Sequence, residues 1–359
     1  MPELNEYKCP ACGGAMEFDS ESQKMKCPYC DTELDVSAFA ESEEKAPAEE
    51  KGGNWESQSK IWDSSETEGM NVYLCESCGG EIVADATTGA SSCPFCGNRV
   101  VMKGKFSGDL KPDYIIPFKL NKKAAKEAYK KHLQGKKFLP KVFSTENHID
   151  EIKGVYVPFW LYDLEAEADI SYRAENVRRW RDKRYEYTEI KSYACRRAGS
   201  ISFEHLPCDA SRKMDDKLME SIEPYDFEGA VPFKNAYMAG YMADRYDVDM
   251  ESRKLRAAER AKKSAELSMA ATVGGYSSVR AERSSVNIRD ARYCYALYPV
   301  WLLNSSWKGE KFTFAMNGQT GKMVGNLPVD NKAFWLNVLM KTGIFSAAVY
   351  AAMAIFMNL

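Results

Sequence analysis

The alternation of hydrophobic and polar positions changes character several times in the central part of the chain. Residues 113–120 form the apolar run DYIIPFKL, which is typical of a strand. The following NKKAAKEAYKKHLQGK has helical spacing, with Asn121 as a suitable N-cap. Residues 154–172 and 294–328 are rich in strand-forming residues, and the second of these contains turns at SSWKGE and NGQTGK. The pattern predicts an α+β body over residues 105–330 with a mainly antiparallel sheet.

Two stretches of this body are variants of one element, in which an aromatic residue and a proline precede Trp-Leu. They read YVPFWLYD and LYPVWLLN, and they contain Trp160 and Trp301. We expect both tryptophans to anchor the cores of two related sheets, because no polar constellation accompanies them. Pro158 and Pro299 have no backbone N–H, so the sequence places them at strand edges or bulges.

A further helix is expected from Asp249 to about Thr272, with Asp249 as its cap and two glycines after its end. It carries six basic and three acidic residues between Met250 and Glu266. Such a face is consistent with ordinary solvation, with anionic lipid or with an acidic partner.

The last segment, residues 333–358, contains a single charged side chain, Lys341. A helix rises by about 1.5 Å per residue, so this segment exceeds the roughly 30 Å thickness of a bilayer core. Its last turns are apolar on every side, which argues against an amphipathic helix buried on the body. Lys322, Lys332 and Lys341 favour a cytoplasmic location for the large N-terminal region. We therefore predict a transmembrane helix at 333–358.

The placement of cysteine changes the picture of the N-terminal third. Eight of the 11 cysteines lie in two copies of the motif C-x2-C-x14-C-x2-C. Two C-x2-C turns can supply four thiolates to one tetrahedral zinc ion, about 2.3 Å from each sulfur. Four protein ligands leave no position for a reacting water, so both zinc ions are expected to be structural. The predicted ligands are Cys9, Cys12, Cys27 and Cys30 for one ion, and Cys75, Cys78, Cys93 and Cys96 for the other.

Each motif is expected to form a small zinc ribbon, at residues 1–40 and 70–104, that needs its metal to fold. In the first, AMEFD and KMKCP can pair around SESQ, and in the second, GEIVADA and SSCPF can pair around TTGA. Residues 41–69 are acidic and lack a core pattern, which predicts a flexible linker. Trp55 and Trp62 in this linker would either dock on a neighbouring surface or serve in recognition.

Charge and motif content bear on the class of function. The net charge of −3 argues against a general nucleic-acid binder. However, VRRWRDKRYEY at 177–187 is basic and aromatic, which suits either single-stranded nucleic acid or a solvated hairpin. No Ser-His-Asp arrangement, H-E-x-x-H or P-loop is recognisable, which favours a protein that is not an enzyme. Cys195, His205 and Cys208 offer a third metal site without an obvious fourth ligand.

The layout as a whole resembles a bacterial family of membrane-anchored proteins with TFIIB-type zinc ribbons. The resemblance rests on the cysteine motifs, on the terminal apolar segment and on LKPDYIIPFKL, LPKVFSTENHIDEIKGVYVPFWLYD, YALYPVWLLN and FAMNGQTGKMVGNLP. Members are often labelled as similar to the replication-restart helicase PriA, but this sequence has no recognisable helicase motor motif. The resemblance implies SPFH-domain (flotillin-like) and phage-shock-type membrane proteins as partners, and it offers no catalytic residues.

Together these features predict a non-enzymatic adaptor in the bacterial cytoplasmic membrane, with its N-terminal domains in the cytoplasm. The paired cysteines and the lack of a recognisable signal peptide agree with that side. Two ribbons on a linker could engage a repetitive protein partner, because linkage raises the effective concentration of the second ribbon. The alternative is a nucleic-acid-binding zinc-ribbon protein that uses the ribbons and residues 177–187.

Overall fold

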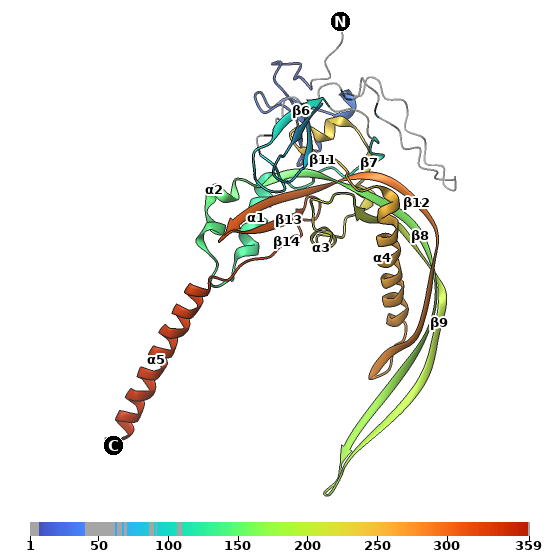
Figure 1. Ribbon diagram of the computed structural model, residues 1–359, viewed down its shortest axis with the longest axis vertical. Helices are drawn as coiled ribbons and strands as arrows, with labels where there is room; N and C mark the ends of the chain where they lie inside the picture. The colour runs from blue at the N-terminus through green and yellow to red at the C-terminus, as the bar shows by residue number, and fades with distance from the viewer. Residues whose placement is uncertain are drawn as a thin grey trace.

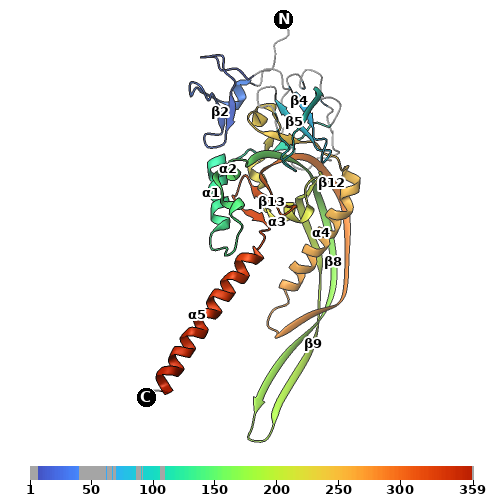
Figure 2. The same cartoon turned by 60° about the vertical axis from the view of Figure 1, so that its left-hand side comes forward.

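The computed structural model describes residues 7–39, 62, 67, 70–85, 90, 92–105 and 110–357. Within them, the chain forms a body around one large, mainly antiparallel sheet, and two long appendages leave this body toward the same end (Figures 1 and 2). One appendage is the helix α5 (Asn331–Met357), and the other is the far part of the hairpin formed by β8 (Lys153–Arg181) and β9 (Glu186–Asp209). The cysteine-containing segments lie at the opposite end of the molecule (Figure 1).

The centre of the sheet is the antiparallel pair of β8 and β12 (Ser278–Trp307). The two sequence variants of the aromatic-proline element therefore pair with each other in one sheet, instead of forming two sheets. Residues 154–162 of β8 are all buried, as expected for a strand covered on both faces. Farther along β8, buried and more exposed residues alternate, because only one face of the sheet is covered there.

Equivalent neighbours flank β8 and β12 on their outer sides. A short parallel strand pairs just before each proline: β11 (Met242–Asp244) with β8, and β7 (Tyr114–Ile115) with β12. An antiparallel strand pairs just after each proline: β9 with β8, and β13 (Glu310–Asn317) with β12. Helix α1 (Lys122–Leu133) follows β7, and α4 (Met250–Ala271) follows β11. The body thus consists of two similar halves, and the short strand of each half pairs with the long strand of the other.

The two prolines lie where the outer neighbour changes. The carbonyl of Pro158 accepts the N–H of Ala210, and that of Pro299 accepts the N–H of Gly318, both at 2.8 Å. In an antiparallel ladder the N and O of one residue point to the same side of the strand. Each proline therefore lacks its N–H on the outer side of its strand, at the point where one outer neighbouring strand ends and the next begins. The expectation of edge strands is therefore wrong, because both prolines lie in the two central strands without removing a bond between them.

The two tryptophans also occupy equivalent positions, two residues after the prolines, and both are buried as expected. Nε1 of Trp160 donates to the carbonyl of Val248 at 2.8 Å. Nε1 of Trp301 donates to the carbonyl of Leu120 at 3.0 Å. Each accepting residue comes immediately before the N-cap of a helix, so each indole fixes where that helix begins against the sheet.

Helices α1 and α4 begin where the sequence predicts. Oδ1 of Asn121 accepts the N–H of Ala124, and Oδ1 of Asp249 accepts the N–H of Ser252, both at 2.8 Å. Helix α4 then lies along the inner side of the curved strands β8, β9 and β12 (Figure 1). The small side chains that it buries there allow close approach of helix and sheet. They are Ala257, Ala261 and Ala265.

The first cysteine motif forms a small sheet of its own, beside the main sheet. Its strands are β1 (Glu17–Asp19), β2 (Lys24–Lys26) and β3 (Glu33–Leu34). The hairpin of β1 and β2 is the one predicted around SESQ.

The second cysteine motif differs from the expectation. Strand β5 (Glu81–Asp85) pairs with β4 (Met70–Leu74), which precedes the motif, and does not pair with SSCPF. Strand β6 (Val101–Lys105) pairs with the other side of β4. Because β5 also pairs with β11, the region expected to be a separate ribbon at 70–104 continues the main sheet of the body.

Shorter elements connect these parts. They are α2 (Glu146–Ile149), α3 (Asp216–Ser221), β10 (Val231–Pro232), β14 (Met323–Gly325) and the 3-10 turns η1 (Val36–Phe39), η2 (Lys141–Ser144), η3 (Phe227–Gly229) and η4 (Asn235–Met238). The expected strand at 113–120 is only the two residues of β7. The three antiparallel strands predicted at 294–328 are confirmed as the end of β12, β13 and β14.

Helix α5 corresponds to the apolar segment expected at 333–358. Among the described residues it is the helix that is long and apolar enough to cross a bilayer, with a window at 331–351 of mean hydropathy 1.2 and no buried part. Its first turn contacts the body, where the rings of Phe334 and Phe138 meet edge to face at 5.5 Å. The helix is therefore attached to the body by its first turn, and its window at 331–351 is not buried against the described part of the chain.

Candidate metal centres

The structure brings together both sets of four cysteines that the sequence predicts as metal ligands. In each set, the four Sγ atoms lie within 4.8 Å of one another. The Sγ atoms of Cys9 and Cys30 are 3.4 Å apart, as are those of Cys75 and Cys96. Four sulfurs bound to one zinc ion at about 2.3 Å would be about 3.8 Å apart. Both sets can therefore hold a tetrahedral metal ion.

Each C-x2-C pair is built on the same tight turn. The residue after its second cysteine has positive φ, and its N–H donates to the carbonyl of the first cysteine at 2.8 to 3.0 Å. These residues are Gly13, Asp31, Gly79 and Gly97. The first cysteine of every pair is buried and the second is at least partly exposed. The turn thus presents two sulfurs on one side while it covers one of them.

Four thiols at these distances cannot all ionise without a cation. At Cys9, burial opposes ionisation, but the N–H groups of Cys12 and Ala11 lower its pKa to about 6. At Cys12, the N–H of Gly14 favours the thiolate, but hydrogen bonding with Cys30 and Cys27 raises its pKa to about 12. A bound cation would let all four sulfurs carry negative charge together.

One short segment of the body, residues 236–245, holds both cysteine clusters. The carbonyl of Ala239 accepts the N–H of Phe18 from the first cluster at 3.0 Å. Four residues later, Ala243 of β11 pairs with Val83 of β5 in the second cluster. The clusters are therefore fixed on the body and relative to each other. The sequence instead indicates two ribbons joined by a flexible linker.

An aromatic ring lies over a glycine in each cluster, but the two rings have different surroundings. Tyr29 and Phe95 each precede the last cysteine, and a Cβ atom on Gly14 or Gly80 would lie 2.6 or 3.2 Å from the respective ring. Phe95 packs against the hydrophobic core of the body. Tyr29 is 76% exposed. The ring at this position is thus exposed to solvent in the first cluster, whereas the equivalent ring attaches the second cluster to the body.

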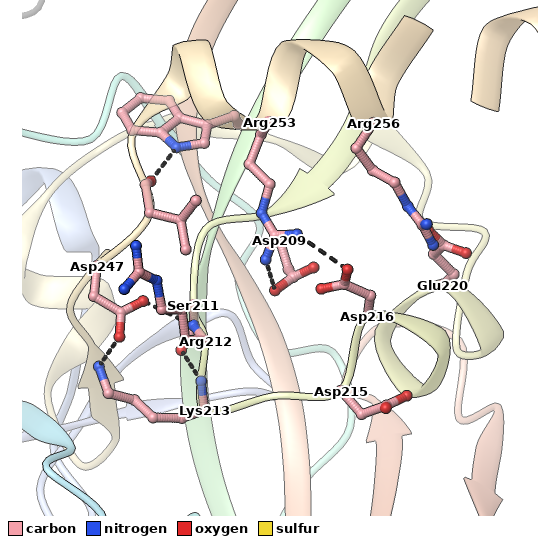
Figure 3. A network of polar contacts seen from close by, with 12 residues as sticks. Asp209, Ser211, Arg212, Lys213, Asp215, Asp216, Glu220, Asp247, Arg253 and Arg256 are labelled. Atoms are coloured by element: carbon pink, nitrogen blue, oxygen red, sulfur yellow. Dashed lines mark hydrogen bonds and ion pairs between the residues drawn. The ribbon is translucent and has the colours of Figure 1, made fainter. Parts of the chain in front are cut away.

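A network of ion pairs connects the N-terminal half of α4 to the last residue of β9 and to the segment after it, and sequence reasoning missed this network (Figure 3). Arg253 binds Asp209 at 3.3 Å and Asp216 at 3.0 Å. Burial raises the pKa of Asp209 to about 7, and Arg253 opposes this rise. Nearby on α4, Arg256 binds Glu220 at 2.6 Å. These pairs fasten the helix over the sheet.

Asp244, at the end of β11, has a completely buried carboxylate in the same region. Neither of its oxygens has a hydrogen-bond partner among the described residues. Nζ of Lys213 lies 3.9 Å from it and 2.7 Å from Asp247. Burial raises the pKa of Asp244 to about 7, although Lys213 opposes this. The open depression beside the network, of about 520 Å³, is lined by both signs of charge and defines no particular ligand.

The third metal site considered for Cys195, His205 and Cys208 does not form. All three residues lie on β9, where Cys195 is opposite Tyr172 and Cys208 is opposite Trp160. A strand rises by about 3.3 Å per residue, so the two cysteines are roughly 40 Å apart. The sequence supplied three residues of suitable type, but an extended strand separates them.

Trp62 is one of the two described residues of the segment 41–69. Its ring meets that of Phe233 edge to face at 5.4 Å, and Nζ of Lys111 lies 5.9 Å from the ring centre. Of the two alternatives for this residue, docking on the body is therefore confirmed. Trp55 and most of the expected linker lie outside the described residues.

Comparison with known proteins gives one clear relationship. No protein-family model and no solved structure matches the chain. The uncharacterized protein YdjG of Bacillus subtilis (strain 168) is 32% identical over 323 residues, which cover 90% of this chain and 90% of that protein. The similarity thus extends over almost the whole of both proteins. The chain belongs to the same family as YdjG.

Proposed function

We propose that the protein is a non-enzymatic adaptor, which α5 anchors in the bacterial cytoplasmic membrane and whose cysteine clusters face protein partners in the cytoplasm. The observation that carries this proposal is that the cysteine clusters and α5 lie toward opposite ends of the molecule. The clusters lie at one end of the body and α5 leaves toward the other (Figures 1 and 2). Because a continuous sheet joins β4–β6 to the central strands, the body can hold the clusters at a fixed distance from a membrane.

Zinc is the metal that both clusters suit best, because four thiolates in a tetrahedron are the donor set of structural zinc sites. Elemental analysis of the purified protein should find two zinc ions per chain. Replacing the buried ligand Cys27 by serine should leave one, whereas Cys195→Ser should leave two. A zinc content that Cys27→Ser does not change would refute the assignment.

Anchorage rests on the length and composition of α5. Its 27 residues span about 40 Å, more than a bilayer core requires. Trp335 is exposed at its start, a position where tryptophan favours the boundary between lipid and water. Lys322, Lys332 and Lys341 support the cytoplasmic side for the body.

The face around Tyr29 is the surface that we propose for partner binding. An exposed aromatic ring on a rigid turn loses little conformational entropy when it is covered, and such residues dominate many interfaces. The sequence resemblance favours SPFH-domain or phage-shock-type oligomers as partners. A repetitive oligomer would bind several adaptor molecules side by side on one membrane.

Affinity capture of the full-length, detergent-extracted protein with nuclease present tests this function. Wild type should retain membrane-scaffold proteins, and Tyr29→Ala should lose them while it keeps two zinc ions. Tyr185→Ala is the matched control, since it removes another largely exposed ring, at the far end of the molecule, and should keep the partners. Capture of replication or RNA proteins that disappear with nuclease would overturn the adaptor and support the nucleic-acid alternative.

A further inference from the structure

We infer that the far end of the β8–β9 hairpin binds the surface of an anionic lipid bilayer. We define this end, residues 177–191, as the hairpin tip. The contact would be a second attachment to the membrane that receives α5, and the inference therefore rests on the proposed anchorage. The proposed adaptor function does not otherwise use this surface of the molecule.

The hairpin tip lacks a third strand in the described part of the chain. Strand β12 begins at Ser278 opposite Glu175, so the central sheet ends before the tip starts. Beyond that point, β8 and β9 pair only with each other, from Val177 opposite Ile190 to Arg181 opposite Glu186. An isolated two-stranded hairpin is marginally stable in water. Contact with an external surface would stabilise it.

Aromatic side chains gather on this tip. Trp180 and Tyr187 face each other across the strands and stack at 5.5 Å, and the guanidinium of Arg178 lies 5.6 Å from the Trp180 ring centre. Tyr185 in the turn is 63% exposed, and Ile190 on the other face is 56% exposed. Tryptophan and tyrosine beside basic residues are the combination that favours the headgroup region of a bilayer.

The charge of the tip is opposite to that of the whole protein. Residues 177–191 contain six basic and three acidic residues, a net charge of +3, whereas the whole chain carries −3. Nearer the body, basic residues of the same strands are paired, as Arg196 is with Asp169 at 2.5 Å. Arg178 lies over the Trp180 ring, and four other basic side chains of the tip likewise form no ion pair with any described residue: Arg179, Arg181, Lys183 and Arg184. These free positive charges suit an anionic surface.

The direction of the tip decides between lipid and nucleic acid as the anionic partner. In Figure 1, a straight line from the start of α5 to the end of the hairpin leaves α5 on one side and the body on the other. A bilayer surface along that line would take α5 into its apolar core and meet the tip at the level of the headgroups. Binding of a nucleic acid would not require the tip to lie at the surface that receives α5.

Photo-crosslinking of the full-length protein in vesicles tests the inference. A benzophenone amino acid is introduced at Tyr185, at Leu339 in α5 or at Tyr29 beside the first cluster, and lipid adducts are identified by mass spectrometry. The vesicles contain phosphatidylcholine alone or phosphatidylcholine with 30 mol% phosphatidylglycerol, a composition of roughly physiological surface charge. We expect adducts from Leu339 in both, from Tyr185 mainly with phosphatidylglycerol, and from Tyr29 in neither.

A charge variant separates a lipid contact from mere proximity. In the background R179Q/R181Q/K183Q/R184Q, the yield from Tyr185 should fall at least tenfold, because each basic residue near an anionic surface changes binding about fivefold. The yield from Leu339 should not change. Adducts from Leu339 without adducts from Tyr185 would overturn this inference and leave the anchor intact, whereas no adducts from Leu339 would overturn the anchorage itself. Binding of single-stranded DNA that the charge variant loses, without lipid adducts from Tyr185, would assign the tip to nucleic acid instead.

Discussion

Replacing Asp244 by asparagine should stabilise the protein, and more so at high pH. Asparagine keeps the shape of the side chain but cannot ionise. Neither oxygen of the buried carboxylate is within hydrogen-bond distance of a partner in the described part of the chain, and Lys213, the cation that lies 3.9 Å from it, is bound more closely by Asp247, at 2.7 Å. Lys213 therefore keeps a partner in the variant. What the substitution removes is the free-energy cost of a buried negative charge.

The magnitude follows from the pKa of Asp244, which burial raises from 3.8 to about 7 in the folded protein. Because the folded state holds this proton more tightly, the stability associated with it is fully present below pH 3.8 and is lost as pH rises through about 7. Linkage gives a cost of about 2 kcal/mol at pH 5.5 and about 4 kcal/mol at pH 8.5. The advantage of Asp244→Asn over wild type should thus grow by about 2 kcal/mol across this range.

Urea unfolding of the detergent-solubilised protein at four pH values between these limits, followed by circular dichroism, measures the difference. The matched control is Asp169→Asn, since Arg196 hydrogen-bonds to Asp169 and lowers its pKa below 3.8. That carboxylate stays ionised over the whole range, so its variant should differ from wild type by a constant amount. An Asp244→Asn advantage that is equally constant would refute the reasoning, because it would mean that Asp244 does not titrate in this window.

Four further substitutions test the packing of the body by the same measurement. Arg253→Met leaves a buried carboxylate without its cation and should cost about 3 kcal/mol, and a cost below about 1 kcal/mol would show that water reaches the site. Trp160→Phe and Trp301→Phe remove equivalent hydrogen bonds and should each cost about 1 to 2 kcal/mol, while an effect confined to one of them would contradict the equivalence of the two halves. Ala261→Leu places extra volume between α4 and the sheet and should cost about 1 to 3 kcal/mol, whereas no loss would mean that the contact is loose.

The features that sequence predicted well are those that depend on residues close together in the chain. A C-x2-C turn is complete within six residues, so spacing and the residue after the second cysteine define it. The caps of α1 and α4 depend on Asn121 and Asp249 and on the N–H three residues later. In the same way, Lys308 and Gly309 have the positive φ that closes the turn between β12 and β13.

The choice of strand neighbours was beyond sequence reasoning, because an apolar pattern indicates a strand and not its partner. Nothing local shows that β5 pairs with β4 and β11 instead of the segment that follows it. For the same reason, the sequence alone places Pro158 and Pro299 at strand edges or bulges. They fit in the central pair of strands because the outer neighbouring strand changes at each proline, and the sequence does not show this change.

The ion pairs of α4 had a partial signal in the sequence. Arg253, Arg256 and Arg260 repeat at helical spacing, and MDDKLMESIE supplies acidic residues upstream. This pattern indicates a basic helix face with acidic neighbours, but it also fits a solvated surface. The burial of Asp209 and Asp244, which makes the region chemically distinctive, depends on packing among segments that are distant in sequence.

The exchange of short strands between the two halves has a consequence for the order in which the protein folds. Strand β7, at residues 114–115, pairs with residues 296–297 of β12, so the first half cannot be completed until nearly the whole body has been synthesised. Such long-range pairing slows folding and leaves apolar strands uncovered in the meantime. Helix α5 emerges from the ribosome after β12, β13 and β14. Synthesis thus supplies every described strand of the body before the apolar helix appears, and the body can close before that helix is complete.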